Sequence, residues 1–187
     1  PACPYYGRCG GCHYQHADYP AQLAGKRDVL IETLRRTGRV EPPGAVETVA
    51  GEPWEYRNRI QVHLSDGELG FHERASHRVC AVDRCPIAAP KLNEALAALR
   101  GILRGRRFPR SPASIELFTN GAQVLASGRQ PVRPLGRRFF EQCAASIAGA
   151  VAGSLDYAVG GRLFRVSHGS FFQVNRFLIE ELVKRTV

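Results

Sequence analysis

Three cysteines near the start of the chain constrain its possible folds more than any other feature. Cys3, Cys9 and Cys12 follow the pattern C-x5-C-x2-C, with two glycines between the last two. Three clustered cysteines and one distant cysteine are a common ligand set for an iron–sulfur cluster, and Cys85 is the candidate for the fourth ligand. Glycines suit such a loop because they reach positive φ and let backbone N–H groups approach the sulfurs.

Two other uses of the six cysteines stay open at this point. The spacings C-x2-C and C-x4-C fit a four-thiolate zinc site built from Cys9, Cys12, Cys80 and Cys85. Disulfide bonds are the third use. They are disfavoured because 187 residues can bury a core, and because we expect an intracellular chain without a signal peptide, in which thiols stay reduced.

The charge balance favours a polyanionic partner. The chain has 26 Lys and Arg residues against 17 Asp and Glu residues, a formal net charge of +9. Such an excess creates a positive field and most often indicates nucleic-acid binding. An arginine-rich proteome encoded by a genome of high GC content shows the same excess. No apolar run is long enough to span a bilayer, so we expect a cytoplasmic protein without a membrane partner. No obligate protein partner is inferred.

Alternating apolar residues and turn signals predict a set of hairpins. The predicted strands cover residues 56–64, 68–72, 78–82, 114–118, 123–127, 157–159 and 163–166. Turns are predicted at 66–67, 120–121 and 160–161, because these dipeptides contain the Gly that tight hairpin turns favour. Basic, Pro-rich loops are expected over 104–110 and 130–138.

The first predicted strand carries a polar face. Ile60, Val62 and Leu64 point to one side, so Arg57 and Arg59 are expected on the other. Two arginines on an open face suit an RNA backbone, although an ordinary half-exposed strand shows the same pattern.

The spacing of apolar residues also predicts helices. Their expected spans are 18–38, 86–104, 139–151 and a C-terminal stretch from 176 onward. Asp18 and Asn175 are the expected N-caps of the first and last helices, and Gly38 is the expected left-handed stop of the first. Cys143 falls on an apolar helix face and is expected to be an inert buried thiol. Hairpins packed with a few helices predict an α+β fold with mainly antiparallel pairing.

Five stretches in order give the chain a resemblance to the iron–sulfur-containing RNA uracil-5-methyltransferases, which make 5-methyluridine in large-subunit ribosomal RNA. These stretches are Cys3…Cys9-Gly-Gly-Cys12, Gln15-His16…Tyr19…Gln22-Leu23…Lys26, Tyr56-Arg57-Asn58-Arg59, Cys85-Pro86-Ile87 and Ser170-Phe171-Phe172-Gln173-Val174-Asn175. Together they run the whole length of the chain, and the first and last are the most specific.

The resemblance implies that Cys3, Cys9, Cys12 and Cys85 ligate a [4Fe–4S] cluster with a structural role. Cys80 is then not a ligand.

The resemblance also assigns roles in binding. It implies that Gln173 contacts S-adenosylmethionine through its side-chain amide, and that Phe171 lies near the flipped target uracil. Arg57 and Arg59 are implied contacts to structured RNA, with 23S rRNA as the expected substrate.

The implied domain organisation leaves out the catalytic part of the family. Its segments are a cysteine loop (1–17), a helix that packs with the absent catalytic domain (18–40), a central α+β RNA-binding domain that includes Cys85 (41–166), and the start of a truncated methyltransferase domain (167–187). The family's Rossmann-like domain, with the catalytic cysteine and base, is missing, so no catalytic residue is assigned here. The helix without a terminator at Val187 favours a piece of a longer enzyme. The alternative is a stand-alone zinc- or cluster-containing nucleic-acid-binding module.

Overall fold

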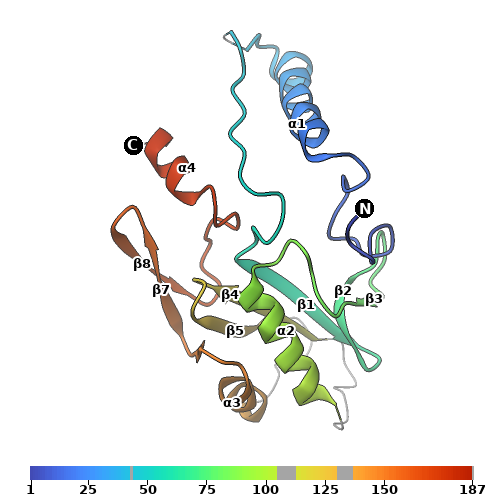
Figure 1. Cartoon of the computed structure of the whole chain (residues 1–187), viewed down its shortest axis with the longest axis vertical. Helices are drawn as coiled ribbons and strands as arrows, with labels where there is room; N and C mark the ends of the chain where they lie inside the picture. Colours follow the sequence, from blue (N-terminus) through green and yellow to red (C-terminus); the bar gives the residue numbers. More distant parts are fainter. Residues whose placement is uncertain (43, 105–112, 130–136, 187) are drawn as a thin grey trace.

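A six-stranded sheet is the centre of the molecule (Figure 1). The computed structural model describes residues 1–42, 44–104, 113–129 and 137–186, so the basic loops expected over 104–110 and 130–138 lie almost entirely outside it. The sheet order is β3-β2-β1-β4-β5-β6, and all neighbours are antiparallel except β5 and β6. The strands are β1 (Arg59–Ser65), β2 (Glu68–His72), β3 (Val79–Ala81), β4 (Ala113–Thr119), β5 (Val124–Arg129) and β6 (Ala150–Val151). The predicted α+β class with mainly antiparallel pairing is confirmed.

The hairpin turns form where the sequence places them, but not all by the same geometry. Asp66 and Gly67, which join β1 to β2, both have positive φ, at 51° and 84°. The β4–β5 connection is longer than a two-residue turn. There the Asn120 side chain accepts hydrogen bonds from the N–H groups of Ala122 (3.1 Å) and Gln123 (2.7 Å). A side-chain amide therefore closes this turn.

The main core lies between one face of the sheet and two helices. Helix α2 (Pro90–Leu103) covers this face together with α3 (Arg137–Ser146), and Figure 1 shows α2 lying across the sheet. Ile60, Val62 and Leu64 of β1 are buried against the apolar stripe of α2. The predicted period-two strand and the predicted amphipathic helix are thus two sides of one core.

Several predicted helix limits differ from the structure. The second helix begins at Pro90 rather than at Pro86. The third helix ends at Ser146 rather than near Val151, which instead belongs to β6. Gly149 has φ 76°, and a Cβ atom there would lie 2.5 Å from the carbonyl oxygen of Ala122. The close approach of these two backbones ends the helix. The C-terminal helix α4 (Ile179–Thr186) begins after the turn that Asn175 caps, rather than at Asn175 itself.

A second, smaller core joins the C-terminal hairpin to the sheet. The hairpin consists of β7 (Ser154–Val159) and β8 (Arg162–Ser167), and its turn uses Gly160 and Gly161, both at positive φ. Its side chains pack with one end of the sheet and with the segment that follows β8. The residues of this cluster are Phe118, Leu125, Val151, Leu155, Tyr157, Val166 and Phe172.

Helix α1 (Tyr19–Thr33) stands away from the sheet (Figure 1) and buries none of its residues in the described structure. Asp18 caps it as predicted, accepting a hydrogen bond of 2.8 Å from the N–H of Ala21. A five-residue π-helical turn follows, Leu34–Gly38, and the left-handed residue after it is Arg39 (φ 52°) rather than the predicted Gly38. In the part of the chain that the structure describes, no helix is long and apolar enough to cross a membrane.

The contact between α2 and the sheet predicts where the stability lies. Leu96→Ala removes a fully buried side chain from the main core and should reduce the free energy of unfolding by about 2–5 kcal/mol. Leu163→Ala is the control, because Leu163 on β8 is 74% exposed and its loss should change stability by no more than about 0.5 kcal/mol. Denaturant titration followed by circular dichroism measures both. Equal effects of the two changes would contradict this assignment of the core.

Candidate metal centre and the adjoining segments

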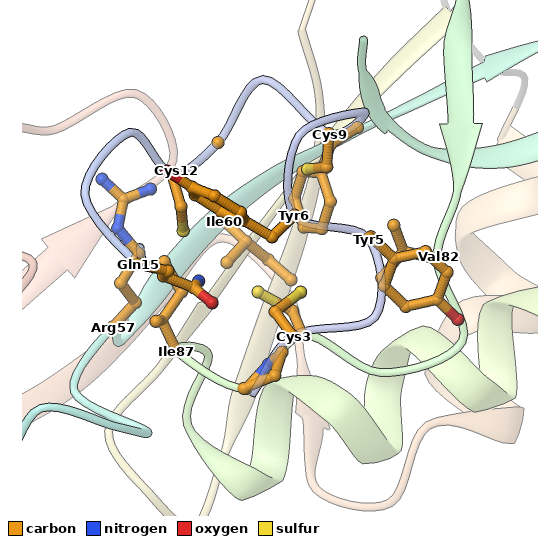
Figure 2. A pocket seen from close by; sticks show the side chains of 14 residues that line it. Cys3, Tyr5, Tyr6, Cys9, Cys12, Gln15, Arg57, Ile60, Val82 and Ile87 are labelled. Carbon is orange, nitrogen blue, oxygen red and sulfur yellow. The ribbon is translucent and has the colours of Figure 1, made fainter. Parts of the chain in front are cut away.

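Four cysteines from two distant segments line one cavity of about 50 Å³ (Figure 2). They are Cys3, Cys9, Cys12 and Cys85, each partly buried. The rest of the lining is mainly apolar or aromatic and comes from the N-terminal loop, from β1 and β2, and from the residues on both sides of Cys85. It consists of Tyr5, Tyr6, Gly11, Gln15, Arg57, Ile60, Phe71, Val82, Pro86 and Ile87.

The N-terminal cysteine loop is docked on the end of β2. The N–H of Gly10 donates to the carbonyl oxygen of His72 (2.9 Å), and the N–H of Arg74 donates to the carbonyl oxygen of Arg8 (2.9 Å). The Arg8 side chain also pairs with Glu73, with Nε 2.7 Å from Oε1. A Cβ atom on Gly10 would lie only 3.1 Å from the His72 oxygen, so glycine permits this close approach.

Asn93 on α2 holds the backbone around Cys85. Its Oδ1 accepts from the Cys85 N–H (2.8 Å), and its Nδ2 donates to the carbonyl oxygens of Cys85 and Ala88, each at 3.1 Å. Three hydrogen bonds from one side chain fix the backbone at Cys85, and with it the direction in which the Cys85 side chain leaves the backbone. The sequence prediction did not include Asn93. The one available signal is an Asn in the first turn of a helix that follows a candidate ligand, because such an amide can bond the preceding loop.

Burial sets the protonation state of two of the thiols. It raises the pKa of the Cys85 thiol to about 11 and also raises the pKa of the Cys9 thiol. Both are therefore protonated at neutral pH in the metal-free chain. Because metals bind cysteine as the thiolate, loading this site would release protons.

The arrangement of donors distinguishes the three predicted uses of the cysteines. All six cysteines lie within the described residues and are free thiols, so the structure contains no disulfide. Among the described residues, the four cavity cysteines included, no three His, Cys, Asp or Glu side chains are arranged to hold a metal ion as they stand. Cys80 is also buried in β3 and does not line the cavity, so the four cysteines of the zinc prediction are not brought together there. The predicted zinc site is therefore not formed. Four thiols around an apolar cavity fit the donor set of an iron–sulfur cluster.

Arg57 and Arg59 do not share the polar face predicted for them. Arg57 precedes β1, lines the cysteine cavity, and exchanges backbone hydrogen bonds of 2.8 Å with Ile87 and Ala89. Arg59 lies on the sheet, where its side chain is only 14% exposed. The guanidinium of Arg59 is surrounded by three groups: the carbonyl oxygen of Ser170 (2.7 Å), the Glu116 carboxylate (3.4 Å) and the Phe118 ring (4.6 Å to its centroid). The RNA contacts of both arginines stay predictions.

Asn58 connects this region to the segment that contains Phe171 and Gln173. The Asn58 side chain is fully buried, its Nδ2 donates to the carbonyl oxygen of Gln173 (2.9 Å), and its N–H donates to that of Val174 (2.9 Å). Along the segment, Phe172 packs into the small core, whereas Phe171 and Gln173 are exposed. Phe171 is 83% exposed, so its ring is available to a ligand.

A larger, polar cavity of about 460 Å³ adjoins the cysteine cavity and shares Cys12 and Gln15 with it. It lies between the N-terminal loop, the start of α1 and residues 52–56. Several residues of the second resembling stretch line it, namely Gln15, Tyr19, Gln22 and Lys26. The structure therefore places that stretch around a second cavity next to the cysteine cavity.

Comparison with known proteins finds RNA methyltransferases. An uncharacterized RNA methyltransferase of Aquifex aeolicus is 30% identical over 99% of this chain and 48% of its own length. The 23S rRNA (uracil(1939)-C(5))-methyltransferase RlmD of Halomonas elongata is 41% identical over 70% of this chain and 28% of its own length. The protein of the same name from Alkalilimnicola ehrlichii is 29% identical over 100% of this chain and 48% of its own length. No family model matches the chain.

A solved structure shares the fold. The tRNA (uracil-54, C5)-methyltransferase of Pyrococcus abyssi, in complex with S-adenosyl-L-homocysteine, superposes with a TM-score of 0.66 at 20% identity. The match covers 98% of this chain and 51% of that one. The chain thus spans about half the length, or less, of the relatives it matches. Across that span, the sequence and fold likenesses agree: the chain belongs to the RNA (uracil-C5)-methyltransferase family.

Proposed function

We propose that this chain is the cluster-bearing, RNA-recognising part of an S-adenosylmethionine-dependent RNA (uracil-C5)-methyltransferase, with 23S rRNA as its substrate. The observation that carries the proposal is the convergence of Cys3, Cys9 and Cys12 with the distant Cys85 on one cavity. The names of the relatives support the reaction and the RNA substrate, and ribosomal RNA as substrate is in keeping with a cytoplasmic protein.

The four cysteines would hold a [4Fe–4S] cluster, which when bound supplies a cross-link rather than electron transfer. The N-terminal loop otherwise depends on a few hydrogen bonds and ion pairs at the end of β2. A group bound by thiolates from both segments ties that loop to the strand and helix that hold Cys85. In this role, the four cysteines position RNA-binding surfaces and take no part in methyl transfer.

Phe171 and Gln173 would form the part of the substrate and cofactor site that this chain contributes. Both side chains are exposed, whereas Phe172 between them is partly buried and packs into the small core. The exposed Phe171 ring offers a stacking surface to an extruded uracil, and the Gln173 amide offers a donor and an acceptor to the cofactor.

The nucleophile of the reaction would lie in another part of the enzyme. Methyl transfer to uracil C5 needs a thiolate that adds to C6 and a base that later removes the C5 proton. Four of the six cysteines line the cavity, and Cys80 and Cys143 are buried. Exposed apolar residues on α1 (Val29, Leu30) and α4 (Leu182, Val183) would contact the catalytic domain.

The metal content tests the proposal directly. Protein purified without oxygen should be brown and contain iron and sulfide, and Cys85→Ser should lose both because it removes the ligand that joins the two segments. Cys143→Ser is the matched control, since Cys143 is buried in the main core away from the cavity. Iron, sulfide and visible absorption are the measurements. Colourless protein that binds one equivalent of zinc would contradict the cluster.

RNA affinity tests the role of Phe171. Phe171→Ala should weaken binding to a single-stranded, uridine-containing RNA by about 1–3 kcal/mol, the range expected for loss of one base–aromatic stack. Leu163→Ala removes a similarly exposed apolar side chain from β8 and should leave the affinity unchanged. Fluorescence anisotropy at fixed salt measures both. The reverse ranking of the two variants would place the RNA on the hairpin instead.

The chain by itself should transfer no methyl group. It lacks an accessible thiol outside the cavity, and the single Gln173 side chain offers too few contacts to hold the cofactor, since one hydrogen bond contributes about 0.5–1.5 kcal/mol. Incubation with labelled S-adenosylmethionine and unmodified ribosomal RNA measures transfer. Transfer that persists in Cys80→Ser and in Cys143→Ser would show that the chemistry uses another residue of this chain.

A further inference from the structure

Two buried polar atoms without hydrogen-bond partners belong to side chains that line the cysteine cavity. They are Nε of Arg57 and Oε1 of Gln15. Native proteins rarely leave such an atom buried and unpaired, because it loses its hydrogen bonds to water and gains none in return. Both atoms lie beside the same candidate centre, which indicates that their partner is the group that occupies the cavity.

Arg57 is the only positively charged residue in the described lining of this cavity. The other lining side chains are mostly apolar or aromatic, so they offer few hydrogen-bond donors to an anionic group in the cavity. A buried negative charge is stable only when it is paired or hydrogen-bonded. Four thiolates around an iron–sulfur core are such a charge, and Arg57 is the complementary cation on the cavity wall. Its guanidinium also hydrogen-bonds the Tyr56 side chain, so Nε is the atom that remains for the cavity.

The backbone fixes the position of Arg57 relative to the ligand loop. Its N–H donates to Ile87 and its carbonyl oxygen accepts from Ala89, both at 2.8 Å, so it is bonded to both sides of a short stretch that follows Cys85. Figure 2 draws Arg57, Gln15 and Cys12 at one end of the cavity. These two hydrogen bonds couple the position of the Arg57 backbone to that of the Cys85 loop.

We infer that Arg57 is an outer-sphere partner of the cluster, donating Nε–H to a cysteine sulfur or to an inorganic sulfide. Gln15 is a second donor on the same side of the cavity. Rotating its side-chain amide by 180° exchanges Oε1 and Nε2 and places an N–H donor where Oε1 now lies. This inference rests on the proposed function. It goes beyond that proposal because it gives Arg57 a role in holding the metal centre, separate from the RNA contact predicted for it.

Two properties of the loaded protein should depend on Arg57. Outer-sphere partners typically change metal affinity by 10–100-fold, because they orient the ligands and strengthen their binding. Hydrogen bonds to the sulfurs and nearby positive charge also raise the reduction potential, because they favour the more negative, reduced state. Loss of Arg57 should therefore make the cluster easier to extract and harder to reduce.

The experiment compares Arg57→Met and Arg57→Lys with the control Arg84→Met. Arg84 adjoins Cys85 in sequence, but its side chain is 65% exposed, pairs with Glu55 and does not line the cavity. The measurements, made on anaerobically purified protein, are the iron content, the rate of iron loss to a chelator and the midpoint potential. Arg57→Met should lose iron about tenfold faster than the unchanged protein and have a more negative potential. Arg57→Lys should keep most of the potential but still lose iron faster, because it keeps the charge and lacks Nε–H.

Each contrary outcome has a distinct meaning. If the unchanged protein contains no iron and sulfide, the proposed function fails, and this inference fails with it. If iron is bound but both Arg57 variants match the unchanged protein, only this inference is overturned. Equal effects of Arg84→Met and Arg57→Met would also overturn it, since a charge outside the cavity would then act as strongly. If Arg57→Met does not fold, the chelator rate of Arg57→Lys decides.

Discussion

The stretch Tyr56–Arg59 is hydrogen-bonded on both sides, and the arrangement of the functional residues depends on it. On one side Arg57 exchanges backbone hydrogen bonds with the residues that follow Cys85. On the other side the Asn58 N–H and side chain bond to Val174 and Gln173, and the Tyr56 carbonyl oxygen accepts from Arg176. Backbone hydrogen bonds are directional and short, so they fix how the cysteine cavity and the Phe171–Gln173 segment lie relative to each other.

The same stretch explains why Arg59 is so enclosed. Its guanidinium lies between an acidic side chain, a carbonyl oxygen and an aromatic ring, which together satisfy its charge in a mostly buried place. The Ser170 oxygen belongs to the segment that Asn58 also holds, so two neighbouring residues, Asn58 and Arg59, bind that segment. Removing either side chain leaves the other as the main side-chain link to that segment.

Local patterns predicted the regular elements well, and long-range contacts account for what they missed. The β1–β2 hairpin and α2 follow from turn chemistry and apolar spacing within a few residues. The end of α3 depends on Gly149 meeting Ala122, and no local pattern contains that information. The same holds at the candidate site: the cysteine spacing together with the family resemblance predicted Cys3, Cys9, Cys12 and Cys85. The support from Asn93 and the placement of Arg57 beside the thiols arise from pairings that only the folded chain defines.

The docking of the cysteine loop on β2 has a consequence for how the protein is made. A ribosome synthesises the N-terminus first, so Cys3, Cys9 and Cys12 are in solution well before His72 and Glu73, the residues that the loop binds, exist. Until then the three thiols have no fixed neighbours and are open to oxidation or to stray metal ions. Docking of the loop is therefore ordered by translation, because the three cysteines can reach their final positions only after the residues at the end of β2 have been synthesised.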